Sequence, residues 1–199
     1  MYIHHKQRGI SLIELIMFIV IVSVALAGIL LVMNVTTKNS ADPIIHKQAL
    51  AIAESLLEEV ELMPFTYCDP DDPAAATASS TAVCAQIENL GPEAAFGTQT
   101  NTETRYGPSY FDNVNDYAGT TAGAPGFPMN AGNGGIKDIT GTVITVLSGY
   151  SAVVSMTQPG LGTIAAADTL LINVTVTGPD LVPVVMEGIR TRYSPNGLP

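Results

Sequence analysis

The sequence Arg8-Gly9-Ile10-Ser11-Leu12-Ile13-Glu14 opens an apolar segment that continues to Met33. The segment from Ile10 to Met33 has 24 residues, and Glu14 is the only one of them with a formal charge. As a helix with a rise of about 1.5 Å per residue it is roughly 36 Å long, enough to cross a hydrocarbon core of about 30 Å. A charge in lipid is costly, so Glu14 needs a partner and is the first candidate functional residue.

An amino group can be that partner. If the chain is cut after Gly9, Ile10 gains a free α-amino group four residues before Glu14. Within one helix the two groups interact weakly, and the carboxylate gains about 0.3–1 kcal/mol at the positive end of the helix dipole. When several copies pack side by side, the carboxylate of one copy can pair with the amine of the next, which neutralises two charges that are costly alone. The pattern therefore predicts a helix that directs assembly.

These residues resemble the N-terminus of type IV prepilins and of type II secretion pseudopilins. The resemblance implies that a prepilin peptidase cuts between Gly9 and Ile10 and methylates the new amino group of Ile10. It also implies that Glu14 aligns subunits in a filament. Ile10 departs from the phenylalanine that is usual at this position in the family, where aliphatic residues are tolerated.

The segments 49–60, 111–117 and 187–196 resemble the minor prepilins of the mannose-sensitive haemagglutinin (MSHA) pilus. The resemblance implies no cofactor, and four kinds of partner: other pilin and minor pilin subunits, the prepilin peptidase/methyltransferase, the inner-membrane pilus assembly platform, and inner-membrane lipid. It implies a single-pass protein of the bacterial inner membrane, with a cytoplasmic N-terminus and a periplasmic C-terminal domain. From there the chain would enter a pilus at the cell surface and act in pilus assembly and cell adhesion.

Three alternatives remain open. A minor pseudopilin of type II secretion has the same N-terminal chemistry, and an uncleaved single span would anchor a periplasmic binding module. A secretory signal peptide would be cut after Ala25-Leu26-Ala27 and would release a chain that begins at Gly28. Against a signal peptide, Glu14 interrupts the apolar region, and the apolar run continues through 29–33.

The composition disfavours two classes of function, nucleic-acid binding and catalysis. The formal net charge is −10, which disfavours nucleic-acid binding because that function needs a basic face. The three histidines are His4, His5 and His46, and this leaves no base for a serine or cysteine nucleophile. We therefore expect a protein that is not an enzyme.

The two cysteines, Cys68 and Cys84, have fifteen residues between them and form no C-x-x-C pair. In an exported domain a disulfide is the first interpretation, and a loop of this size would be stabilised by about 3 kcal/mol. Two buried free thiols are the alternative. A disulfide would place this part of the chain in an oxidising compartment.

A second helical pattern follows the apolar segment. Asp42-Pro43 is typical of a helix start, so we expect a kink or short break between about 34 and 42. The pattern of 44–63 predicts an amphipathic helix that ends at Pro64 and has the apolar face Leu50, Ala53, Leu56, Leu57, Val60 and Met63. The other face holds Glu54, Glu58, Glu59 and Glu61, as a solvated surface or as a docking patch for basic neighbours.

The sequence pattern of the C-terminal part predicts strands at 142–147, 151–156, 172–177 and 184–193. In the third of these, apolar and polar residues alternate without interruption. The fold class that follows is α+β: a long N-terminal helix, whose apolar half spans a membrane, packed on a four-stranded antiparallel sheet. The predicted segments are a leader (1–9), an apolar helix (10–33), a kink with an amphipathic helix (34–63), an irregular region with a short helix near 83–90 (64–138), and the sheet (139–199).

The segment 111–117 gathers oxygen-bearing side chains, among them Asp112, Asn115 and Asp116. Asx turns bonded to their own backbone explain such a cluster, and no metal is the first interpretation. The alternative is calcium bound by these three residues, as some pseudopilins bind calcium in a comparable loop. The spacing does not match an EF-hand loop.

Overall fold

The computed structural model describes Gly9, 11–94, 96–97, 102–129, 134–193 and Asn196, with only the backbone described for 35–42. Its regular elements are α1 (Leu12–Leu62), β1 (Pro125–Met129), β2 (Ser151–Thr157), β3 (Thr169–Thr177) and β4 (Pro183–Thr191), joined by loops that contain short 3-10 helices. The chain divides into two compact units, Met1–Ile44 and Ile45–Pro199. Residues 12–44 of α1 belong to the first unit, and the rest of α1 belongs to the second.

Helix α1 is continuous through 34–42, where the sequence predicts a kink or short break. Pro43 lies inside the helix and not in its first turn, so the predicted helix start at Asp42-Pro43 is wrong. Proline removes one backbone donor, at a cost of about 3 kcal/mol in a helix interior. Helix formation is cooperative, so the long helical segments on both sides of Pro43 maintain the helix across that single loss.

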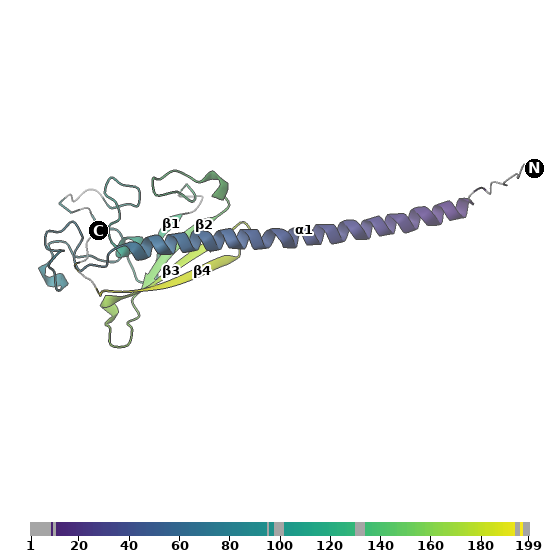
Figure 1. Cartoon of the computed structure of the whole chain (residues 1–199). Coiled ribbons are helices and arrows are strands. Elements are labelled where there is room, and N and C mark those ends of the chain that lie inside the picture. Colours follow the sequence, from purple (N-terminus) through teal and green to yellow (C-terminus); the bar gives the residue numbers. More distant parts are fainter. Residues whose placement is uncertain are drawn as a thin grey trace, which may run out of the picture. The chain divides into compact units, whose positions relative to one another are not determined.

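The part of α1 from Ile45 onward covers one face of the sheet (Figure 1). Its buried residues follow a three- and four-residue spacing: Ala49, Ala53, Leu56, Leu57 and Val60. The hydroxyl of Tyr150 donates to Gln48 Oε1 at 2.5 Å, and Arg190 donates to the carbonyl oxygen of Met63 at 2.7 Å. Most of the predicted apolar face is confirmed, but Leu50 is 41% exposed because the packed face is centred on the two alanines.

The sheet is an antiparallel meander in the order β1-β2-β3-β4. Alternate residues of the two central strands are buried against α1: Ala152, Val154 and Met156 of β2, and Leu170, Ile172, Val174 and Val176 of β3. The predicted α+β class, a helix on a four-stranded antiparallel sheet, is confirmed. Strands β2, β3 and β4 correspond to the predicted strands at 151–156, 172–177 and 184–193.

The first strand is not where the sequence predicts it. Residues 142–147 form no strand: Val143 makes an isolated bridge with Lys137, and Thr145–Leu147 is a 3-10 helix. The first strand is β1, within the region expected to be irregular, so the sheet does not begin at 139. Two prolines and a glycine make β1 look like a loop, but prolines are tolerated on the edge strand of a sheet.

The glycine of β1 has a packing role. A Cβ on Gly126 would collide with the carbonyl oxygen of Tyr117 and the backbone of Ala118. Only glycine therefore allows β1 to lie this close to the 3-10 helix Val114–Tyr117.

The helix predicted near 83–90 is also absent. Thr81–Val83 forms a 3-10 turn, and Ile87 then pairs with Cys68 in an isolated β-bridge.

Candidate functional site

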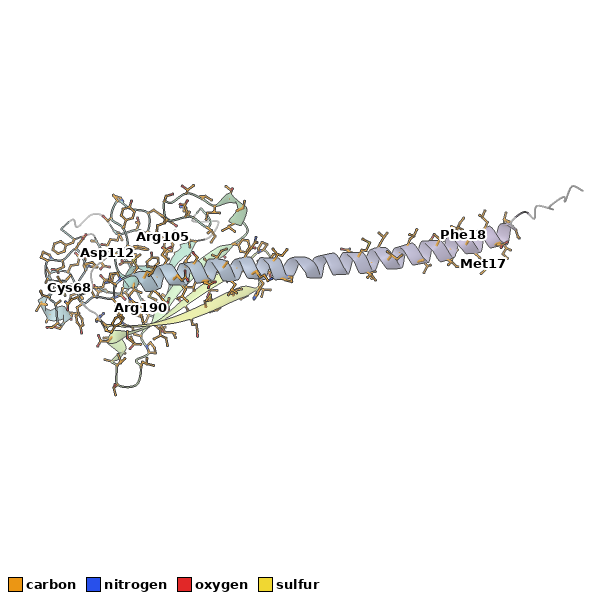
Figure 2. The ribbon with its side chains drawn as sticks, in the orientation of Figure 1. Met17, Phe18, Cys68, Arg105, Asp112 and Arg190 are labelled. Carbon is orange, nitrogen blue, oxygen red and sulfur yellow. A yellow bond between two sulfur atoms is a disulfide. The ribbon has the colours of Figure 1, made fainter. Side chains whose placement is uncertain are left out.

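The N-terminal part of α1 is apolar and exposed. Leu12–Asn34 is a stretch of 23 residues whose most apolar window has a mean hydropathy of 3.2 and no buried residue. It is the one helix among the described residues that is long and apolar enough to span a membrane. Met17 and Phe18 project outward from it (Figure 2). At the start of the helix, the N–H of Leu15 donates to the carbonyl oxygen of Ser11 at 3.1 Å. Such a surface is stable only in lipid or against other apolar helices.

Glu14 lies in the first turn of this helix, and it is exposed. Within the described part of the chain, no side chain pairs with its carboxylate. The hydroxyl of Ser23, another polar side chain of the span, donates to the carbonyl oxygen of Ile19 at 2.7 Å and is satisfied within the helix. Unlike Ser23, the carboxylate of Glu14 has no partner within the described helix, and such a charge is costly in lipid.

The predicted processing site is described only in part. Gly9 is exposed and precedes the helix, whereas Ile10 lies outside the described residues. Cleavage between them and methylation of Ile10 therefore stay predictions.

Residues 4–30 match the sequence family described as the prokaryotic N-terminal methylation motif. The chain carries a type IV pilin-like signal. This signal supports a place in the superfamily of pilins and pseudopilins, and implies processing by a prepilin peptidase and assembly with other pilins. Together with the apolar helix it fits a membrane-anchored structural protein. No curated protein and no solved structure matches the chain.

Within the second unit, a partly buried ion pair connects a loop to the part of α1 that follows Ile45. Arg105 donates from Nε to Glu59 Oε1 at 2.5 Å and from Nη2 to Glu59 Oε2 at 2.6 Å, and its Nη1 reaches the carbonyl oxygens of Lys137 and Asp138. Burial alone lowers the pKa of Arg105, but the Glu59 carboxylate outweighs burial and the pKa is raised. The prediction that Glu59 belongs to a solvated face is therefore wrong, whereas Glu54 and Glu58 are exposed as expected.

Aromatic side chains surround this ion pair. The hydroxyl of Tyr117 donates to Glu59 Oε1 at 2.7 Å, and burial followed by this hydrogen bond raises the pKa of Tyr117. The rings of Phe111, Tyr117 and Phe127 meet edge to face, with centroids 4.9–6.0 Å apart. The guanidinium carbon of Arg105 lies 5.7 Å from the centre of the Phe127 ring. Three loop segments and β1 are thereby fixed against α1.

The predicted disulfide between Cys68 and Cys84 is present (Figure 2 labels Cys68). Asp72 lies within its loop, and its carboxylate accepts the backbone N–H groups of Ala74, Ala85 and Gln86 at 2.7–2.8 Å. These hydrogen bonds lower the pKa of Asp72. The disulfide and this carboxylate together fix a loop that has only a small apolar core of its own.

The segment 111–117 contains the Asx turns that the sequence predicts. The side chain of Asn113 accepts the N–H of Asn115 at 3.3 Å, and Asp116 Oδ2 accepts the N–H groups of Asp112 and Asn113 at 2.9 and 2.8 Å. These bonds cap the 3-10 helix Val114–Tyr117. They use one oxygen of Asp116 and leave Oδ1 without a partner among the described residues.

Proposed function

We propose that the chain is a minor type IV pilin of the MSHA type, most similar to the minor prepilin MshD. In this proposal a prepilin peptidase removes residues 1–9 and methylates Ile10. The span Leu12–Asn34 holds the subunit in the inner membrane until it is extracted into a filament. The observation that carries the proposal is the coincidence of the methylation motif at 4–30 with an exposed apolar helix whose one charge, Glu14, lies in the first turn.

The mechanism follows from the cost of charges in an apolar environment. Once residues 1–9 are removed, each subunit has a positive amino group at Ile10 and a negative carboxylate at Glu14. Each charge is expensive alone between apolar helices, so a neighbour that supplies the opposite charge stabilises one register of packing over the others. The carboxylate thus selects the axial position at which a subunit joins the filament. Retention of Glu14 favours a subunit that stacks beneath another or enters the shaft.

Mass spectrometry of the membrane-extracted chain tests the proposal. The expected mature chain lacks nine residues and carries one added methyl group on its new N-terminus. The control is the same chain from cells that lack the prepilin peptidase, in which the intact Met1 should be retained. An intact N-terminus in cells with an active peptidase would contradict the proposal in favour of a plain anchor, and a chain that begins at Gly28 would indicate a secreted module.

A minor pseudopilin of type II secretion would pass the same test. Its assembly chemistry is shared, so the two are separated by where the mature chain accumulates. For a pilin, we expect the chain to co-purify with pili sheared from the cell surface. Its absence from sheared pili, together with correct processing, would favour the secretion system.

A further inference from the structure

Five carboxylates meet in the loops that follow α1: Glu88, Glu93, Glu103, Asp112 and Asp116, here called the acidic cluster. Oxygens of Glu88, Glu93 and Asp116 lie within 4.8 Å of one another, and so do oxygens of Glu103, Asp112 and Asp116. Asp116 belongs to both groups and joins them. Figure 2 marks the position of the cluster by its label on Asp112.

Three members of the cluster, Glu88, Glu103 and Asp116, are buried, and oxygens of all three lack hydrogen-bond donors. Glu88 is 5% exposed, and neither of its carboxylate oxygens has a hydrogen-bond partner among the described residues. The same holds for Oε2 of Glu103, which is 3% exposed, and for Oδ1 of Asp116, which is 1% exposed. A buried carboxylate without a donor or a counter-charge is strongly unfavourable, so something must neutralise these groups.

No described residue forms an ion pair with the cluster. The two ion pairs of the described residues, Arg105–Glu59 and Arg192–Asp168, lie outside the cluster. Burial, and then the other carboxylates, raise the pKa of Glu103 to about 9 and that of Asp116 to about 8. The cluster therefore binds either protons or a metal ion.

The backbone fixes the cluster in advance. Asp116 is held by the two N–H groups that reach its Oδ2, so Oδ1 points into the cluster without a partner. The backbone of Glu103 is held by its N–H, which donates to the carbonyl oxygen of Glu93 at 3.0 Å. The backbone of Glu88 is held in the same way, since its N–H donates to the carbonyl oxygen of Tyr67 at 3.2 Å. Ligands held in this way lose little freedom when an ion binds.

The all-oxygen donor set indicates the kind of ion. Calcium takes six to eight oxygen ligands at about 2.3–2.6 Å, so oxygens on opposite sides of the ion are roughly 5 Å apart. The oxygens within each group lie close enough together to contact one such ion. Zinc prefers nitrogen and sulfur, and both cysteines of the chain are in the disulfide. Magnesium requires a smaller octahedral shell and keeps much of its water.

We propose that the acidic cluster binds calcium, which ties three loop segments of the second unit together. Two residues of this site, Asp112 and Asp116, also belong to the calcium site that the sequence offers as an alternative. The other three members are glutamates, which the sequence pattern does not predict as ligands. Asp69 lies close to Asp71 and Asp112, but we do not include it in the site. Both of its oxygens already accept hydrogen bonds, Oδ1 from the N–H of Asp71 and Oδ2 from Nε2 of Gln86 at 2.6 Å. The site does not depend on filament assembly, so its failure and that of the pilin proposal are distinguishable.

Thermal unfolding of the full chain in detergent micelles tests this site. After treatment with EGTA, addition of CaCl2 should raise Tm in a saturable way by about 5 °C or more, with a midpoint of roughly 0.1–1 mM if the affinity is that of extracellular calcium modules. MgCl2 at the same concentrations should raise it much less. Isothermal titration calorimetry with CaCl2 on the same sample should show binding in the same range.

The variants Glu103→Gln and Glu88→Gln locate the site. Each should weaken calcium binding at least tenfold, whereas Glu54→Gln, on the exposed face of α1, should leave it unchanged. No saturable effect of CaCl2 on the wild-type chain in either measurement would overturn the proposal, whether or not the variants fold. Unchanged calcium affinity in both folded variants would overturn it as well, because the ion would then bind elsewhere.

Discussion

The two units of the chain place carboxylates in apolar surroundings in opposite ways. In the first unit, Met1–Ile44, the one carboxylate of the apolar span Leu12–Asn34, that of Glu14, lies exposed. In Ile45–Pro199 several carboxylates are buried or partly buried, and they are neutralised in different ways: by Arg105 for Glu59, by backbone N–H groups for Asp72, and by a proposed ion for the acidic cluster. In our proposal the counter-charge of Glu14 comes from another molecule, whereas Glu59 and Asp72 of the second unit are neutralised within the chain.

This difference indicates that the two units have different roles. A unit with an unsatisfied charge and an uncovered apolar surface is built to associate, and its fold is complete only in lipid or in a filament. A unit with internal ion pairs, a disulfide and a covered sheet is built to keep its shape before and after assembly. Changes in the first unit should therefore affect assembly, and changes in the second should affect stability.

The largest expected effect belongs to Glu14→Ala. Loss of the carboxylate removes the proposed partner of the amino group on a neighbouring subunit, and 1.4 kcal/mol lost at one contact already lowers an equilibrium tenfold. We expect at least a roughly tenfold lower amount of the chain in sheared filaments, measured against its amount in membranes by quantitative immunoblotting. The membrane level and the processing should not change.

Ser23→Ala is the matched control for that experiment, since Ser23 lies in the same span and bonds only within its own helix. It should be incorporated like the wild type. Normal incorporation of Glu14→Ala would contradict the pairing mechanism and would remove the contrast between the two units.

Arg105→Met tests the second unit, in which the Glu59 carboxylate is paired with a cation of the same chain. The substitution leaves the partly buried Glu59 carboxylate without its cation; breaking a fully buried pair costs about 3–5 kcal/mol, so we expect about 3 kcal/mol here. The free energy of unfolding of the full chain in detergent should fall by that amount, measured in urea by tyrosine fluorescence, as the chain has seven tyrosines and no tryptophan. Processing at the N-terminus should be unaffected.

The double variant Arg105→Met/Glu59→Leu separates the ion pair from simple packing. With both charges removed, most of the lost stability should return, because no unpaired charge remains. If the double variant is as unstable as the two single changes added together, the guanidinium acts by filling space and the electrostatic account is wrong.

The N-terminal signal could be read from the sequence because its parts are adjacent in the chain. Gly9, Glu14 and the apolar run form one linear pattern, and the alternation in β3 and the packing face of α1 are likewise local periodicities. The disulfide followed from the presence of two cysteines in an exported chain.

What the sequence did not reveal depends on contacts between distant residues. Periodicity shows on which side of a helix Glu59 lies, but not that Arg105, 46 residues later, covers that side. The acidic cluster is formed by glutamates that are scattered along loops without regular spacing. Strand β1 was missed because its prolines and Gly126 are unfavourable for a strand in isolation, and become acceptable only at a sheet edge beside the 3-10 helix Val114–Tyr117.

The smallest expected effect concerns Asp72, whose charge is stabilised by backbone N–H groups. Asp72→Asn weakens three charge-assisted hydrogen bonds, and we expect it to cost about 1 kcal/mol near pH 6. Because the pKa of Asp72 in the folded chain is below its ordinary value of 3.8, this contribution is fully present above that value and is lost as the pH falls through the lower, folded pKa. The difference in Tm between Asp72→Asn and wild type should therefore shrink from pH 6 to pH 3, and the other acidic groups cancel because both chains contain them. A difference that stays constant over this range would mean that the side chain acts by its shape and not by its charge, and that this loop does not neutralise its carboxylate as the rest of the second unit does.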